Sequence, residues 1–360
     1  MMRTVLLSDI CSYVNSKIQV EQVQLTNYVS TENLLQNKGG LSVANKLPSG
    51  KVTAFQAGDV LVSNIRPYFK KIWLADRSGG ASNDVLVFRK LNDEIYEKYL
   101  YYILADDRFF SFSTASASGS KMPRGDKVQI MNYPVKLPPL DQQKKIANIL
   151  GSLDEKIELN RRMNETLEQL GQALFRHYFV DKTKRGNNIQ TLPLGERIRP
   201  KRGKSLQSKN MIDGNMPVIS GGLKPAGSHN KANTVAPVIT ISASGANAGF
   251  VSVWGEPVWS ADSSYIDSTM TKYVYTYYLF LKNKQKEIYD MQTGSGQPHI
   301  YPKHIGLLEI ADLSECEFND FEQRVRPLFD MIHENKKQID YLSNIRDLLL
   351  PKLISGGIEI

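Results

Sequence analysis

The sequence has little cysteine and no long apolar segment. Its 360 residues include two cysteines, Cys11 and Cys316, which lie far apart and form no CxxC pair. These features exclude a disulfide framework and a cysteine-rich zinc site. No run approaches the roughly 18 apolar residues that a membrane helix needs, and the N-terminal apolar stretch is too short for a secretory signal. We therefore expect a soluble, cytoplasmic protein.

Histidine is also scarce, and no metal site is expected. The five histidines are His177, His229, His299, His304 and His333. Only His299 and His304 are close in sequence, and no acidic residue or third ligand accompanies them at a suitable spacing. Packing or ligand contact within a basic loop suits this pair better.

The common catalytic motifs are missing as well. Residues 203–205 read GKS, but Ile198 stands where a phosphate-binding loop needs glycine. Ser242 occupies the first glycine position of a GxSxG nucleophile elbow. No GxGxxG follows a strand, and no Asn-Pro-Pro or Asp-Pro-Pro run precedes an aromatic residue, as amino-methyltransferases require. Glu334 and Lys336 match half of a nuclease motif without its paired acidic strand. We therefore expect no catalytic residue on this chain.

Positive charge is in excess and is unevenly distributed. The chain has 45 lysines and arginines against 37 acidic residues, a formal net charge of +8. Residues 181–204 carry eight basic and two acidic side chains, and residues 121–145 carry six and two. Clustered cations of this kind neutralise phosphates and release counterions, so they favour a nucleic-acid partner. For residues 181–187, a solvated linker is the alternative.

A repeat with an offset of 175 residues relates the two halves of the chain. The segments GSKMPRGDKVQI and GSGQPHIYPKHI share four aligned residues: Gly119, Ser120, Pro123 and Ile130 recur as Gly294, Ser295, Pro298 and Ile305. The same offset aligns two long helical patterns and an Asn-basic-basic triplet that begins at Asn160 and at Asn335. Because the match includes a segment that is not helical, a chance alignment of two amphipathic helices does not explain it.

The order of patterns predicts an α+β fold with two copies of one unit. In each half, two strands joined by a polar loop precede an aromatic-rich helix. We expect mixed α/β domains at residues 1–140 and 181–317, and long helices at residues 141–180 and 318–360. The two mixed domains would be separated by the two long helices, which pack as an antiparallel coiled coil about a pseudo-twofold axis.

Both long helices carry the alternating spacing of a coiled coil. Seam positions follow one another at intervals of four and three from Ile146 to Leu174, and again from Phe321 to Leu342. Helices of about 35 residues would span roughly 50 Å and act as spacers.

The ends of these helices are marked by proline and an acidic residue. Pro138 and Pro139 stop the preceding strand, and Asp141 can accept the free amides of the first turn. Pro351 predicts the end of the second helix. The equivalent dipeptides Gly151-Ser152 and Arg326-Pro327 predict a break or kink in both helices.

Two asparagines interrupt the apolar seam. Asn160 and Asn335 occupy equivalent positions near the middle of their helices. A buried seam asparagine commonly fixes helix register at some cost in stability. With antiparallel packing about a pseudo-twofold axis, Asn160 would face Asn335; a solvated asparagine on a loosely packed turn is the alternative.

Side chains suited to base recognition lie in loops of both halves. Arginine and lysine pair with guanine, and asparagine and glutamine pair with adenine. In the first half the candidates are Asn64, Arg66, Lys70, Lys71, Lys121 and Arg124. In the second half they are Lys224, His229, Asn230, Lys231, Asn247, Gln297, His299 and Lys303. The basic stretch adds phosphate-contacting candidates: Arg197, Arg199, Lys201, Arg202 and Lys204.

Two segments resemble the specificity subunits of type I restriction-modification systems. The run LPPLDQQKKIANILGSLDEKIELNRRMNETLEQLGQALFRHYF is similar to the central conserved region of that family. GSGQPHIYPKHIGLLEI, followed by RVRPLFDMIHENKKQIDYLSNIRDLLLPKLISGGI, is similar to the end of the second target recognition domain and the distal conserved region. The resemblance covers nearly the whole chain, in order.

The resemblance implies a DNA-recognition subunit without chemistry of its own. Two target recognition domains would each read one half of a split, asymmetric DNA site, and the two helices would act as a ruler between them. Two methyltransferase (modification) subunits would dock on the helices, and restriction (translocase-nuclease) subunits would join them. Adenine methylation and DNA cleavage would belong to those partners. S-adenosylmethionine, ATP and magnesium are accordingly expected only there, and no cofactor or metal is expected on this chain.

Three alternatives stay open from the sequence. The chain could be a nuclease or methyltransferase whose site goes unrecognised. It could be a coiled-coil scaffold that binds protein and not DNA. It could also serve a related type II system, in which modification and cleavage share one partner polypeptide.

Overall fold

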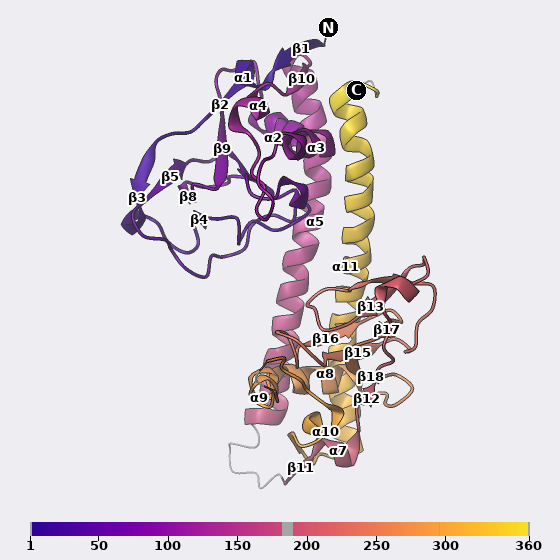
Figure 1. Ribbon diagram of the computed structural model, residues 1–360. Helices are drawn as coiled ribbons and strands as arrows, with labels where there is room; N and C mark the ends of the chain where they lie inside the picture. Colours follow the sequence, from indigo (N-terminus) through magenta and orange to yellow (C-terminus); the bar gives the residue numbers. More distant parts are fainter. Residues whose placement is uncertain (1, 182–189, 295, 359–360) are drawn as a thin grey trace. The chain divides into compact units, whose positions relative to one another are not determined.

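The computed structural model describes residues 2–181, 190–294 and 296–358. The chain forms two compact units: Met1–Glu158 with Asp340–Ile360, and Leu159–Ile339. Each unit contains one mixed α/β domain and a part of both long helices (Figure 1). The predicted α+β class with two mixed domains and two long helices is confirmed. Among the described residues, none of the helices combines the length and apolar character needed to cross a membrane.

The first unit is built on two four-stranded sheets. The order of one sheet is β2 (Cys11–Tyr13), β9 (Val85–Lys90), β6 (Val60–Ser63), β7 (Ile72–Leu74). The order of the other is β3 (Lys17–Gln19), β5 (Lys51–Phe55), β8 (Gly79–Ala81), β4 (Tyr28–Val29). A separate antiparallel pair joins β1 (Arg3–Leu6) to β10 (Pro134–Leu137), next to the start of the first long helix (Figure 1). The helices of this domain are α1 (Leu7–Ile10), α2 (Glu97–Ala105), α3 (Asp107–Ala115) and α4 (Lys127–Met131).

The core of the first unit forms where α2 and α3 pack on the sheet that contains β6. All four residues of β6 are buried, as expected for a central strand covered on both faces. The aromatic residues Tyr99, Phe109 and Phe110 are almost completely inaccessible and lie in this core with Phe88 of β9. The same cluster takes in Leu350 and Leu353 near the end of the chain. Burial of these large side chains, at roughly 1.5–3 kcal/mol each, anchors the domain to the helices.

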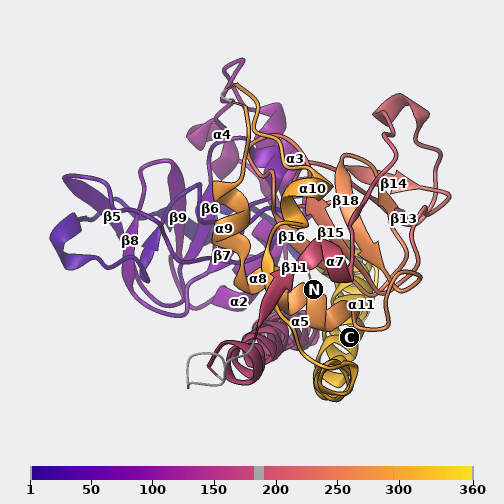
Figure 2. The same cartoon turned by 90° about the horizontal axis from the view of Figure 1, so that it is seen from below.

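The second unit repeats this architecture. Its main sheet has the order β12 (Lys201–Arg202), β18 (Ser263–Asp267), β15 (Val238–Ser242), β16 (Val251–Trp254). A three-stranded sheet has the order β14 (Gly227–His229), β13 (Met216–Ile219), β17 (Trp259–Ser260), and β11 (Thr191–Pro193) pairs with β19 (Glu309–Ala311). The helices are α7 (Leu194–Arg197), α8 (Val274–Asn283), α9 (Gln285–Asp290) and α10 (Pro302–Ile305), and α8 packs against β15 and β16 (Figure 2).

The sequence repeat corresponds to a structural repeat. The helices α4 and α10 begin 175 residues apart, as do the strands β10 and β19. Gly119 and Gly294 have φ values of 103° and 96°, in a region that favours glycine because it lacks a Cβ atom. Each glycine lies within a small hairpin, closed by a bridge between Ser118 and Arg124 in one unit and between Thr293 and His299 in the other. Ser295, the partner of Ser120 in the repeat, lies outside the described residues.

The long helices are α5 (Leu140–Phe175), which continues into a π-helical turn (Arg176–Val180), and α11 (Glu315–Ser355). Both run unbroken through the dipeptides where a break or kink was predicted, so a break is excluded and a kink stays a prediction. The end of α11 was predicted near Pro351; the helix passes through this proline, reaches Ser355 and stops before Gly356, whose φ is +75°. Val325 and Phe329 are buried on either side of Pro327, and this packing sustains the helix despite the missing amide.

The two long helices run antiparallel within each unit. In the first unit, Arg346 of α11 pairs with Asp154 of α5 at 2.8 Å. In the second unit, Phe175 of α5 packs edge-to-face with Phe321 of α11, with ring centroids 5.9 Å apart.

Candidate nucleic-acid interface

The first unit brings five predicted DNA-binding residues together in what we call loop cluster 1, residues 64–70 and 118–124: Asn64, Arg66, Lys70, Lys121 and Arg124. The backbone of Arg124 bridges Ile65, and the amide of Arg66 donates to the carbonyl of Pro123 at 2.8 Å. The guanidinium of Arg66 donates to the carbonyl of Lys121 at 3.2 Å. The hairpin that contains Lys121 and Arg124 is therefore fixed on the loop that follows β6. Arg66, Lys121 and Arg124 therefore lie on adjoining segments.

Loop cluster 1 is held in an unusual backbone conformation. Arg66 and Lys70 flank the 3₁₀ turn Pro67–Phe69 and have φ values of 51° and 50°, in the left-handed region. Asn37 and Lys38 are also left-handed, and their amides donate to the carbonyls of Phe69 and Lys70 at 2.9 Å. Strained residues of this kind persist where the surrounding structure determines them, and they are concentrated at binding sites.

Ion pairs hold Lys70, while Lys71 is turned inward. Lys70 pairs with Asp107 at 2.7 Å, and Asp107 also pairs with the buried Lys38 at 3.2 Å. Lys71 donates to the carbonyl of Thr31, and burial lowers the pKa of its ammonium group. Lys70 is thus close to the surface, whereas Lys71 is committed to a backbone contact.

Asn64 and His229 are predicted readers that the structure places inside the domains. Asn64 is 6% exposed, and its Oδ1 has no hydrogen-bond partner. His229 is also 6% exposed; its Nδ1 accepts the amide of Ile212 at 3.0 Å, and its ring contacts Trp259 edge-to-face. Burial argues against a base contact by either side chain, because neither can reach a groove from that position.

The second unit has an equivalent arrangement, which we call loop cluster 2, residues 243–249, 293–294 and 296–299. Ser244 bridges His299, and the amide of Gly245 donates to the carbonyl of Pro298 at 3.0 Å. Asn247 forms a turn beside them, with its carbonyl accepting the amide of Phe250. Three predicted residues, Asn247, Gln297 and His299, therefore share one loop cluster, in which Gln297 is exposed.

The basic stretch divides into structural and exposed residues. Residues 182–189, which include Lys182, Lys184 and Arg185, lie outside the described residues. Arg197 is committed to contacts within the domain: it pairs with Asp312, and its guanidinium lies 4.9 Å from the ring centroid of Phe318. Lys201 and Arg202 are exposed on β12, which is the edge strand of the main sheet, and Arg199 and Lys204 on either side are exposed as well.

The other predicted residues of the second unit lie in surface segments. Gly221, at the start of the loop that carries Lys224, lies against Ser244 and Asp262, so this exposed loop adjoins loop cluster 2. Asn230 and Lys231 are exposed after β14. Lys303 is exposed on α10, with its ammonium 5.9 Å from the ring centroid of Tyr301.

Known proteins with a related sequence point to one family. Residues 2–169 match the family model described as the type I restriction modification DNA specificity domain. The HindI specificity subunit of Haemophilus influenzae is 28% identical over 184 residues, which cover 49% of this chain and 40% of that protein. The MjaIX specificity subunit of Methanocaldococcus jannaschii is 24% identical over 307 residues, 74% of this chain and 70% of that protein. The chain is thus similar in sequence to type I specificity subunits.

A solved structure shows that the fold is shared. The crystal structure of the type I restriction-modification S subunit from M. genitalium aligns with a TM-score of 0.64 at 20% identity, covering 98% of this chain and 96% of that chain. The fold of this chain, with its duplicated domains and long helices, thus has a counterpart along nearly its whole length.

The seam asparagines of the long helices are buried but do not pair as expected. Asn160 is 0% exposed, and its Nδ2 donates to Oε1 of Gln338 at 3.1 Å. Asn335 is 6% exposed, and its Nδ2 donates to Oδ1 of Asn164 at 2.9 Å. The partner of Asn160 lies three residues after Asn335, and the partner of Asn335 lies four residues after Asn160. The expected direct pairing of the two asparagines is therefore wrong. A role of both residues in fixing the register stays a prediction.

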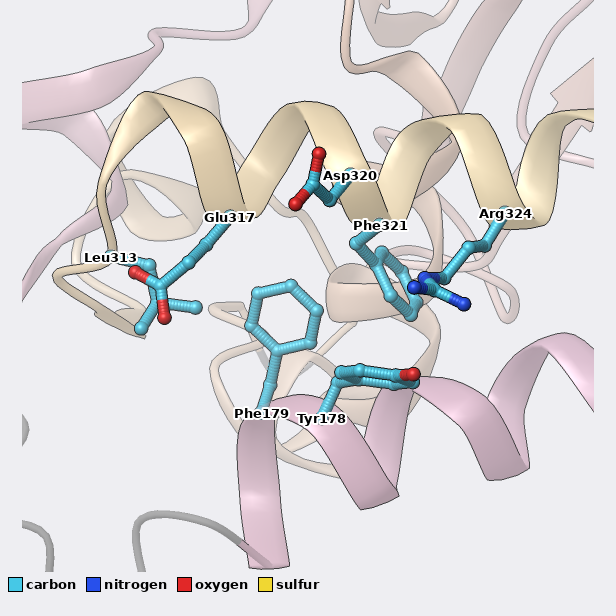
Figure 3. A pocket seen from close by; sticks show the side chains of 7 residues that line it. All are labelled: Tyr178, Phe179, Leu313, Glu317, Asp320, Phe321 and Arg324. Carbon is cyan, nitrogen blue, oxygen red and sulfur yellow. The ribbon is translucent and has the colours of Figure 1, made fainter.

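A small cavity lies where the end of α5 meets the start of α11 (Figure 3). Tyr178 and Phe179 face Phe321 and Leu313, and the guanidinium of Arg324 lies 5.7 Å from the ring centroid of Tyr178. The cavity volume is about 110 Å³, well below the roughly 300–1,000 Å³ of a small-molecule site. It belongs to the packing of the helix ends.

The sequence analysis missed two acidic residues at the loop clusters. Asp84 lies just before β9 and contacts Arg124, and Asp262 lies just before β18 and contacts Arg202. Their sequence positions differ by 178 residues, so the 175-residue repeat does not align them. A comparison of the two sheets would have found them, because both precede the equivalent strand.

Proposed function

We propose that this chain is the sequence-specific DNA-recognition subunit of a type I restriction-modification complex. Each mixed domain reads one half of a bipartite, asymmetric DNA site. The observation that carries the proposal is the recurrence of one loop arrangement in both units, built on the same backbone contacts but bearing different side chains. A shared platform with different side chains is what two different half-sites require.

Phosphate and base contacts are divided among the cations of each unit. Exposed lysines such as Lys121, Lys201 and Lys204 suit phosphates, which fix the position of the duplex without reading its sequence. Other side chains within loop clusters 1 and 2 suit base edges in the major groove. Because the two clusters differ in composition, the two half-sites differ in sequence.

The long helices suit protein partners. Exposed apolar side chains occur on both of them, among them Leu159, Leu170 and Met331 in the second unit and Tyr341 and Leu348 in the first. We infer that these side chains contribute to contiguous apolar contact surfaces for protein. In the proposal these surfaces receive two methyltransferase subunits, and restriction subunits complete the nuclease. S-adenosylmethionine, ATP and magnesium act on those partners, and the target adenine leaves the base stack for methylation there.

A salt-titrated DNA-binding assay tests the proposal. The full chain, together with its methyltransferase partner, is expected to select a two-part motif from random duplex DNA. Its affinity should fall steeply with salt, with a log–log slope of roughly −0.9 for each phosphate contacted. A scaffold that binds only protein would show neither motif nor slope. Methylation or cleavage of DNA by the chain alone, with magnesium and S-adenosylmethionine, would contradict the assignment of chemistry to the partners.

We further propose that the helices set the gap between the half-sites. Removing four residues from each helix, about one turn, shortens it by roughly 6 Å, which corresponds to about two base pairs. Sequencing of methylated sites should then show an altered gap and two unchanged half-sites. A change in a half-site sequence would contradict the ruler.

A further inference from the structure

An aspartate occupies the same place in each unit. The carbonyl of Asp84 accepts the amide of Asn64, the first residue after β6, at 2.9 Å. The carbonyl of Asp262 accepts the amide of Ala243, the first residue after β15, at 3.1 Å. Since β6 and β15 are the equivalent central strands of the two main sheets, Asp84 and Asp262 are equivalent in position.

Each aspartate holds an arginine, and the two arginines come from different elements. Nε and Nη2 of Arg124, in the hairpin of loop cluster 1, both lie 3.2 Å from Oδ1 of Asp84. Nη2 of Arg202, on the edge strand β12, donates to Oδ1 of Asp262 at 2.6 Å. Oδ2 of Asp262 also accepts the hydroxyl of Ser244 in loop cluster 2. Two unrelated chain segments thus bring a guanidinium to the same acidic position.

These ion pairs are too exposed to act mainly in stability. The side chains of Arg124 and Arg202 are 52% and 42% exposed, and pairs of this kind contribute little to folding. Their effect is to restrict the guanidinium to one orientation. Asp84 engages Nε and Nη2 of Arg124, and within the part of the chain that the structure describes, Nη1 has no hydrogen-bond partner. The edge of the planar guanidinium that carries Nη1 is therefore presented to the surface.

A neutral base edge suits such an arginine better than a phosphate does. A carboxylate about 3 Å from the guanidinium offsets its charge and repels an approaching phosphate. The O6 and N7 acceptors of guanine carry no net charge, and they match two parallel donors of an oriented fork. The neighbouring Lys121 and Lys201 lack such an acidic partner among the described residues and suit the phosphates.

We infer that Arg124 and Arg202 each read a guanine, one in each half-site, and that Asp84 and Asp262 are positioning residues that orient them. This inference rests on the proposed DNA-recognition function and names the residues that determine specificity. Because one arginine belongs to a hairpin and the other to an edge strand, the guanine occupies a different place within each half-site.

Selection from a duplex DNA library with a randomised segment tests the inference. The full chain in complex with its methyltransferase partner is compared with Arg124→Ala, Arg124→Lys and Asp84→Asn, and with Arg202→Ala and Asp262→Asn. Loss of Arg124 should reduce discrimination for one guanine by about 5- to 150-fold, the range for a bidentate arginine contact, and leave the other half-site unchanged. Arg202→Ala should do the same in the other half-site only.

The aspartate variants separate orientation from folding. Asp84→Asn should weaken guanine preference while affinity for random DNA stays equal or rises, since a negative charge is removed; a folding defect would lower both. Arg124→Lys keeps the positive charge but lacks the two parallel donors of the planar guanidinium. Guanine preference should therefore weaken while the affinity for random DNA stays unchanged. The matched control is Arg3→Ala on β1, which breaks an exposed ion pair with Glu94. It should change neither the guanine preference nor the affinity for random DNA.

Two results would overturn the inference in distinguishable ways. If Arg124→Ala lowers affinity equally for all sequences and reduces the salt slope by about one, the arginine contacts a phosphate and the inference fails while the proposed function stands. If the wild-type complex selects no motif, the proposed function itself fails.

Discussion

Replacement of Asn160 by leucine is expected to stabilise the second unit. Asn160 is completely buried between the long helices, and its amide makes one hydrogen bond, to Gln338. Its Oδ1 has no partner. Gln338 is only partly buried, so water can replace the lost contact. The native asparagine therefore keeps an unpaired polar atom in an apolar position, which leucine would remove.

The magnitude follows from four opposing contributions. Loss of the hydrogen bond costs about 1 kcal/mol, and removal of the unpaired buried acceptor returns about 1–3 kcal/mol. Burial of the leucine side chain contributes about 2 kcal/mol, against an overpacking cost of about 1–3 kcal/mol. The sum is a gain of about 1 kcal/mol, or roughly 2–4 °C in Tm for a unit of this size.

Thermal and urea unfolding of the full chain measure this change, with Asn164→Leu as the matched control. Asn164 lies one turn further along the same helix and accepts the amide of the buried Asn335. Its loss should destabilise the unit by about 1–3 kcal/mol, because a buried donor is left unpaired. A loss of more than about 1 kcal/mol in Asn160→Leu, or the same sign of change in both variants, would refute the reasoning.

Two further predictions concern buried charges. Arg346 is 6% exposed and pairs with Asp154 and Asp347; burial lowers the pKa of its guanidinium, but the two carboxylates outweigh burial and raise it. Arg346→Met should lower the free energy of unfolding in urea by about 2–3 kcal/mol, and adding Asp154→Leu should recover most of that loss. An Arg346→Met variant within about 0.5 kcal/mol of wild type would contradict this prediction. Burial, aided by Lys336 and Lys337, lowers the pKa of His333 to about 4. Between pH 6.5 and 4 the unfolded chain therefore binds more protons, and stability should fall by up to about 3 kcal/mol as the pH drops through that window. In thermal melts, the stability of His333→Gln should fall less than that of the wild type as the pH drops. Identical pH profiles of the two proteins would count against a role of His333.

The duplicated architecture and the long helices could be predicted because their signals lie in the sequence itself. Gly119 and Gly294 occupy left-handed positions that other residues rarely adopt, and the apolar seam has a fixed period. The ends and continuity of the long helices could not be predicted as reliably. Proline at 327 and 351 signals a break locally, but buried neighbours such as Val325, Phe329 and Leu353 come from the three-dimensional packing.

The candidate site could be predicted as loops but not as individual contacts. Arg66, Lys121 and Arg124 do lie together, since the hairpin docks beside the end of β6. The burial of Asn64 and the inward turn of Lys71 depend on distant partners that no local pattern names. The direct pairing of the seam asparagines assumed an ideal pseudo-twofold axis, and the helices in the second unit are displaced from it by about one turn.

Backbone contacts explain how one loop arrangement can carry two different sets of side chains. The amide of Arg66 bonds the carbonyl of Pro123 in one unit, and the amide of Gly245 bonds that of Pro298 in the other. These hydrogen bonds fix the hairpin on the end of the central strand whatever side chains the loops bear. The cores, formed by α2 and α3 in one unit and α8 in the other, lie beneath and supply the folding energy. Exposed substitutions away from such contacts typically change stability by less than about 0.5 kcal/mol. The loop clusters can therefore change their side chains, and with them the half-site that each reads in the proposed function, without loss of the fold.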